Sequence, residues 1–149
     1  MSEKPRVTRC GMGIMVMDTQ HRVLMGLRNS DAKLADSDLH GEGTWTMPGG
    51  KFEFGEGLFA GAARELREET GLELKSAELI SVTNEVSDNA HFVTLGFLAT
   101  DAAGEVRVME PDEIVCWQWF DLNALPKNIY APTRKLIENY LANRLTGDL

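Results

Sequence analysis

Three acidic residues in the middle of the chain form the pattern most suited to chemistry. Glu68 and Glu69 lie three and four residues after Glu65, and in a helix this spacing places side chains on one face, with about 5–6 Å between their Cβ atoms. Like charges at this separation repel each other and destabilise the helix. Carboxylate oxygens are the ligands that hard cations such as Mg²⁺ and Mn²⁺ prefer. The cluster therefore predicts a divalent-metal site.

A solvated helix face is the alternative interpretation of this cluster, because Arg64 and Arg67 could offset its charge. The surrounding residues favour the metal site. The segment from Gly50 to Leu72 reads G-x5-E-x7-R-E-U-x-E-E-x-G-U, where U is a bulky aliphatic residue, and every fixed position is filled. The residues that fill it are Gly50, Glu56, Arg64, Glu65, Leu66, Glu68, Glu69, Gly71 and Leu72.

This segment resembles the Nudix box, and the sequence is similar to the Nudix hydrolase superfamily. The segment WTMPGG at residues 45–50 resembles the family's lead-in to the box, and the segments EFGE, HFVT and WQW, at residues 53–56, 91–94 and 117–119, resemble the MutT-related branch that acts on nucleoside triphosphates. The resemblance implies an α+β fold, an α/β/α sandwich around a mixed β-sheet. It also implies a single Nudix domain over residues 1–149, in which the polar residues 1–6 form a loose end.

The resemblance assigns roles to the box residues. Glu65, Glu68 and Glu69 would bind Mg²⁺, with Mn²⁺ as a substitute, and Gly50 would add its carbonyl oxygen. The metal would lower the pKa of a bound water, and Glu65, or Glu68 beside it, would take the proton of that water. Arg64 would orient a box carboxylate.

Other candidate residues lie around this core of the site. Glu56 would tie the loop before the helix to the helix itself. Glu110 and Glu113 are candidates for the further acid that family members often use. Trp117 and Trp119 share one face of an expected strand and could stack on a base, although tryptophan more often lies in a core. Candidates for substrate contacts are His91, Thr94, Trp117, Trp119 and Glu113.

The composition limits the class of protein and its partners. A chain of 149 residues has room for one domain, and its net charge of −8 argues against a nucleic-acid-binding groove. The apolar runs at residues 11–17 and 57–63 are too short to span a membrane, and no signal peptide is evident. The two cysteines, Cys10 and Cys116, indicate a reducing cytoplasm, and we expect both to be inert core thiols. His21 and His40 lack partners at zinc-ligand spacing.

The elements that must position the box follow from hydrophobic periodicity. On the helix expected at residues 58–70, Leu58, Phe59, Ala62, Ala63 and Leu66 share one face, and Gly71 is placed to cap its end. We expect strands at residues 7–17, 22–28, 91–100 and 114–120, a weaker strand at 105–109, mixed strand and loop at 74–85, a long loop at 29–43 and a terminal helix at 131–145.

Three functions remain open at this level. The first is Mg²⁺-dependent cleavage of nucleoside triphosphates to nucleoside monophosphate and pyrophosphate, by a possible homodimer. The second is hydrolysis of nucleoside diphosphate derivatives such as ADP-ribose; some relatives of that group carry a proline where Ser87, Asp88 and Asn89 stand here. The third is a non-catalytic Nudix-fold binding module, although such modules usually lose box carboxylates and all are present here.

Overall fold

The strands of this computed structural model, which describes residues 5–35 and 41–149, form two sheets. The first has the order β4-β1-β6-β5 and the second the order β3-β2-β7. Strands β1 and β6 are parallel and their other neighbours antiparallel, so the first sheet is mixed. The strands are β1 (Thr8–Met15), β2 (Arg22–Arg28), β3 (Trp45–Thr46), β4 (Gly49–Lys51), β5 (Glu73–Val86), β6 (His91–Ala103) and β7 (Ile114–Asp121).

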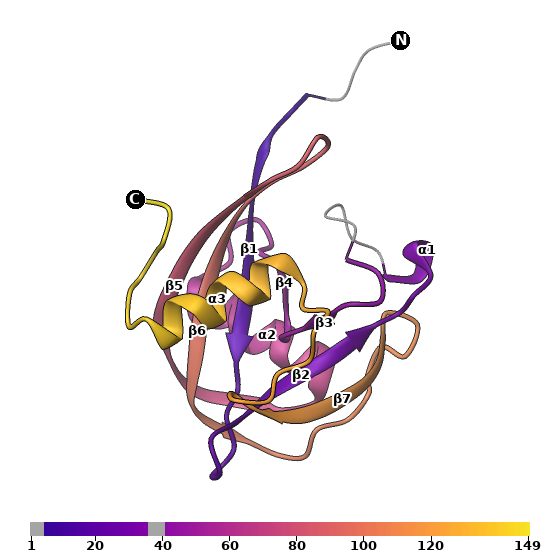
Figure 1. Ribbon diagram of the computed structural model, residues 1–149, viewed down its shortest axis with the longest axis vertical. Coiled ribbons are helices and arrows are strands. Elements are labelled where there is room, and N and C mark those ends of the chain that lie inside the picture. The colour runs from indigo at the N-terminus through magenta and orange to yellow at the C-terminus, as the bar shows by residue number, and fades with distance from the viewer. Residues whose placement is uncertain (1–4, 36–40) are drawn as a thin grey trace.

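Two helices cover opposite faces of these strands. In Figure 1, α3 (Ala131–Leu141) lies in front of the strands and α2 (Leu58–Thr70) behind them. Alternate residues of β1 point to opposite faces: Ile14 packs in the cluster that contains Leu66 of α2, and Met15 packs in the cluster that contains Leu136 of α3. The predicted α+β sandwich around a mixed sheet is thus confirmed. A short helix, α1 (Ala32–Ala35), interrupts the expected long loop.

Helix α2 has the predicted bounds, but its buried stripe is narrower than expected. Gly71 ends it with a φ of 78° and donates its N–H to the Arg67 carbonyl, which is the left-handed cap that glycine favours. Leu66 is fully buried, whereas Leu58 and Phe59 are 51% and 49% exposed. These two side chains belong to the first turn, which precedes the first buried position of the helix.

Several other expectations need correction. Helix α3 ends at Leu141 rather than at residue 145. Residues 105–109 form no strand, because β5 and β6 already pair with each other along almost their full length and the chain turns away at Gly104, just after β6. Cys10 is exposed rather than buried in a core. The start of β1 and the β5–β6 hairpin project beyond both α2 and α3, so neither of these helices covers them (Figure 1).

Two expectations meet the limits of the described residues. Residues 5 and 6 are exposed and belong to no helix or strand, while residues 1–4 lie outside the described residues, as does His40. His21 lies in a turn with a φ of 59°. Within residues 5–35 and 41–149, no helix has the length and apolar character that a bilayer-spanning segment requires.

Candidate active site

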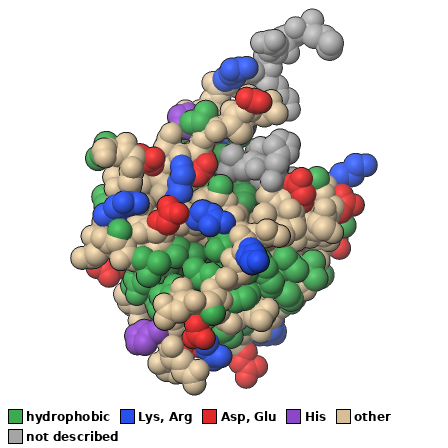
Figure 2. All heavy atoms as spheres, in the orientation of Figure 1, with side chains coloured by type: hydrophobic (Ala, Val, Ile, Leu, Met, Phe, Trp, Pro, Cys, Tyr) green, Lys and Arg blue, Asp and Glu red, His purple; other side chains and the backbone are tan. Residues whose placement is uncertain are grey.

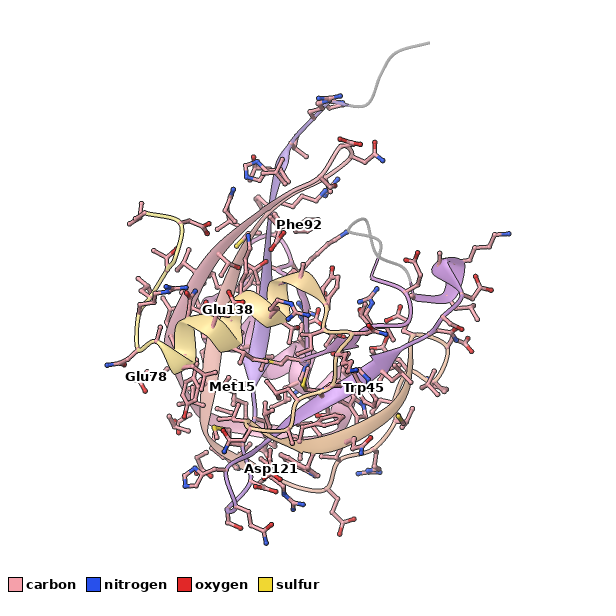
Figure 3. The ribbon with its side chains drawn as sticks, in the orientation of Figure 1. Met15, Trp45, Glu78, Phe92, Asp121 and Glu138 are labelled. Atoms are coloured by element: carbon pink, nitrogen blue, oxygen red, sulfur yellow. The ribbon has the colours of Figure 1, made fainter. Side chains whose placement is uncertain are left out.

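A cavity of about 440 Å³ lies between the sheet, the start of α3 and the carboxylates of α2. Its position follows from where α3 touches the sheet. A Cβ on Gly13 or Gly96 would lie 3.2 or 2.8 Å from a methyl carbon of Leu136, so α3 packs directly on these glycines. Phe92 and Thr94 precede Gly96 in β6, and both line the cavity although they are only 7% and 8% exposed. Figure 3 shows Phe92 above α3 and Met15 below it.

The cavity brings together most of the predicted site residues. Its lining includes the box residues and the two acids of the loop before β7: Gly50, Arg64, Glu65, Glu68, Glu69, Glu110 and Glu113, together with Thr94. The carboxylates of a helix and of a loop far along the chain therefore face one space. His91, Trp117 and Trp119 are absent from the lining.

Arg64 forms hydrogen bonds with four residues of the box segment. Its Nε and Nη2 donate to Glu56 at 2.6 and 2.8 Å, and its Nη1 donates to Glu65 at 2.8 Å and to Glu68 at 3.1 Å. Its Nη2 also donates to the Lys51 carbonyl at 3.0 Å. The bonds from Arg64 hold the pKa of Glu56 at about 2. Glu56 thus links the loop to the helix, and Arg64 orients two box carboxylates.

Glu65 and Glu69 are half-buried carboxylates whose pKa values lie above that of an ordinary glutamate. Burial raises the pKa of Glu65, and the bond from Arg64 opposes that shift. Burial also raises the pKa of Glu69 well above its ordinary value, and the nearby charges of Glu65, Glu110 and Glu113 add to the shift. A backbone N–H, that of Gly49, donates to Glu69 Oε2 at 3.0 Å and opposes the shift.

The candidates outside the cavity have other partners. Trp117 donates its indole N–H to the Glu69 carbonyl at 3.2 Å. Trp119 packs against the core that contains Leu66. His91 lies at the exposed end of the β5–β6 hairpin, where its ring nitrogens pair with Thr8 and Asn84. Their placement gives no support to base stacking by the tryptophans or to a substrate contact by His91.

The lining also contains residues to which the sequence assigned no role. The guanidinium of Arg28 lies 4.8 Å from the ring centroid of Tyr130 and donates to the Gly41 carbonyl at 2.9 Å. Lys51 Nζ lies 5.6 Å from the ring centroid of Phe92. Phe92 belongs to the HFVT segment and Lys51 directly follows Gly50 of the box, so the motifs point to the neighbourhood of both. Arg28 and Tyr130 are far apart in sequence and carry no local signal.

Comparison with known proteins decides the family. The NUDIX domain family matches residues 7–140. The chain belongs to the Nudix family. Among solved structures, a MutT NUDIX hydrolase from Burkholderia pseudomallei has a TM-score of 0.80 and 30% identity, covering 90% of this chain and 98% of that one. A MutT protein from Methanosarcina mazei Go1 has the same fold, with a TM-score of 0.78 and 20% identity, over 94% of this chain and 97% of that one.

Curated relatives of this Nudix chain include the NAD-capped RNA hydrolase NudC of Pseudomonas aeruginosa (strain LESB58). It is 33% identical over 141 residues, which are 91% of this chain and 49% of the relative. NudC of Stutzerimonas stutzeri (strain A1501) is 32% identical over the same shares of the two chains. The chain thus spans about half the length of the curated relatives it matches.

The residues of this Nudix box suit a hard divalent cation. Within the described residues, no group of three or more His, Cys, Asp or Glu side chains is already arranged to hold a metal ion. Mg²⁺ rarely uses such a group, because it keeps several waters and binds through one or two carboxylates and substrate phosphates. Glu69 is a half-buried carboxylate with carboxylate neighbours, and the Glu65 carboxyl lies so close to Gly50 that a Cβ there would be 2.6 Å away. A bound cation would relieve the repulsion between Glu69 and the neighbouring carboxylates.

The raised pKa of Glu69 predicts how its charge affects stability without metal. A folded-state pKa above the unfolded one means that ionisation destabilises the fold. The wild type should therefore be less stable than Glu69→Gln at neutral pH, and the difference should disappear as the pH falls below the ordinary value of 4.5. Denaturant unfolding in chelator across this range measures it, with Glu78→Gln, an exposed residue of β5, as the control. A Glu69→Gln protein that is less stable at neutral pH would contradict this expectation.

Proposed function

We propose that this Nudix protein is a divalent-metal-dependent hydrolase of nucleoside triphosphates, which it cleaves at a diphosphate linkage to nucleoside monophosphate and pyrophosphate. The main support is the convergence of Glu65, Glu69 and Gly50 on one cavity with Arg64 fixed beside them. The Burkholderia pseudomallei MutT NUDIX hydrolase, matched over 98% of its length, supports the resemblance to the MutT-related branch on which the triphosphate assignment rests.

The chain's own residues prepare the attack of water on phosphorus. Mg²⁺ held by Glu65, Glu69 and Gly50 would neutralise phosphate charge and make a bound water more acidic. Glu65 accepts the proton of the attacking water as a general base. Arg64 holds the Glu65 carboxylate in place through its Nη1. Glu69, fixed by the Gly49 N–H, contributes negative charge where the cation binds.

The remaining walls of the cavity receive the organic part of the substrate. Phe92 and Thr94 offer an apolar surface and a hydroxyl on the sheet, and Tyr130 with Arg28 forms the opposite part of the lining. On the face shown in Figure 2, Lys and Arg side chains are interspersed with Asp and Glu. Capture of the anionic substrate by the metal, rather than by a basic surface, fits this distribution and the net charge of −8.

A second candidate is the cleavage of a dinucleotide or other nucleoside diphosphate derivative. The NudC relatives, which are NAD-capped RNA hydrolases by name, favour it through 33% identity over 91% of this chain. The same carboxylates would serve this reaction, because the bond attacked is again a diphosphate linkage. An RNA 5′ end is then a substrate to test, although we predict no nucleic-acid partner.

The two candidates predict different products and label positions. Attack on the β-phosphorus of a nucleoside triphosphate in ¹⁸O-water should place the label in pyrophosphate and leave the monophosphate unlabelled. A panel of nucleoside triphosphates, ADP-ribose, NAD and NAD-capped RNA, each with Mg²⁺, compares kcat/KM by product analysis. A higher kcat/KM for ADP-ribose or NAD would replace the triphosphate assignment. Release of single phosphate with a nucleoside diphosphate would reject it.

Two parts of the proposal concern the setting of the protein. We infer a cytoplasmic location from the low cysteine content and the short apolar runs. A homodimer is the proposed assembly, by analogy with related Nudix proteins. Light scattering on the purified protein measures the mass, which is 16.5 kDa for one chain.

A further inference from the structure

Trp117 connects the second sheet to the last turn of the Nudix helix. The last carbonyls of a helix have no hydrogen-bond partner within it, and three of those in α2 accept hydrogen bonds from residues outside the helix. The Arg67 carbonyl accepts the Gly71 N–H, and the Thr70 carbonyl accepts the Arg107 N–H. The Glu69 carbonyl accepts the indole N–H of Trp117, a side chain of β7, at 3.2 Å. The backbone of a predicted metal ligand is therefore held by a strand of the other sheet.

Packing keeps the Trp117 ring in this position. The ring is half-buried against the core that contains Leu66 of α2. On its other side it lies against Gly26 of β2, where an added Cβ would be 2.8 Å from the ring carbon Cζ3. The strands β2 and β7 pair at these two residues. The indole N–H thus has little freedom to leave the Glu69 carbonyl.

The same strand carries the acids that approach Glu69 from outside the box. Strand β7 begins at Ile114, directly after Glu113, and both Glu110 and Glu113 line the cavity with Glu69. Their charges are close enough to Glu69 to affect its pKa. Because Trp117 lies three residues into β7, its bond to the Glu69 carbonyl ties the strand that carries these acids to the helix that carries Glu69.

We propose that Trp117 is a positioning residue for the divalent-cation site. Its hydrogen bond sets the separation between Glu69 on α2 and the acids Glu110 and Glu113 before β7. The inference rests on the proposed function only in that a divalent cation binds at the box. It replaces the base-stacking role that the sequence suggested for Trp117. It also accounts for glycine at position 26, since the ring needs the space of a side chain there.

Trp117→Phe and Trp119→Phe are a matched pair of variants for the test. Both residues are half-buried in β7 and pack against the same core, but the bond to the helix carbonyl comes from Trp117. Mn²⁺ binding without substrate, measured by electron paramagnetic resonance, should weaken about tenfold in Trp117→Phe and change less than about twofold in Trp119→Phe. Melting temperatures of the metal-free proteins should fall to a similar extent in both. Equal Mn²⁺ affinities in the two variants would overturn the proposal.

A measurement on the wild type keeps the proposal testable if Trp117→Phe does not fold. The indole N–H resonance of Trp117 should shift on titration with Mg²⁺, while that of Trp119 should not. Equal responses would overturn the proposal. A wild type that binds Mn²⁺ but hydrolyses no substrate would reject the proposed function alone, whereas a wild type that binds no metal would reject both.

Discussion

Replacing Glu65 or Glu69 by glutamine should lower kcat by at least about two orders of magnitude, the scale expected for the loss of a general base or a metal ligand. Glutamine keeps the size of the side chain but removes the charge and the ability to accept a proton. The Gly49 N–H can still bond to the amide oxygen at position 69, so the fold should persist. Steady-state kinetics at saturating Mg²⁺ measure the change in kcat.

Controls separate this effect from a general change of charge. Glu78→Gln removes a carboxylate from an exposed position of β5 and should leave kcat unchanged. Circular dichroism should show that both site variants are folded. If Glu65→Gln and Glu69→Gln retained rates close to the wild type, the assignment of the site would be wrong.

Removal of divalent metal should abolish activity, and millimolar Mg²⁺ or Mn²⁺ should restore it. The carboxylates of Glu65 and Glu69 cannot by themselves neutralise the charge of a polyphosphate or make water sufficiently nucleophilic. The experiment is an assay in excess chelator with metal-free buffers, followed by titration of each metal. Because Mg²⁺ should bind the folded protein and not the unfolded chain, the melting temperature of the apo protein should also rise when Mg²⁺ is added. Full turnover in chelator would contradict the mechanism.

Local sequence signals predicted the central helix and its chemistry. Residues 58–70 form α2 as expected, because amphipathic spacing and the glycine at position 71 act over short distances along the chain. The spacing of Glu65 and Glu69 places both on that helix without reference to the rest of the molecule. Even so, the same periodicity overestimated the buried face: Leu58 and Phe59 remain half-exposed, since burial depends on what lies opposite the helix.

Long-range pairing was harder to predict. Residues 74–85 read as mixed strand and loop, yet β5 is a continuous partner of β6 with several irregularities of register. The position of Cys10 in a strand is correct, but its exposure follows from the projection of β1 beyond the helices that cover the rest of the sheet. A strand pattern does not show where a covering layer ends.

The sequence by itself determined the family resemblance, the carboxylate helix and its cap, because each depends on residues close together in the chain. Only the tertiary structure decided what surrounds that helix. Packing of α3 on the glycines of β1 and β6 forms part of a cavity whose lining includes the buried residues Phe92 and Thr94. Pairing of β7 with β2 brings Trp117 to the Glu69 carbonyl and Glu113 into the cavity. These contacts join residues remote in sequence, and the packing that creates them is a property of the whole fold.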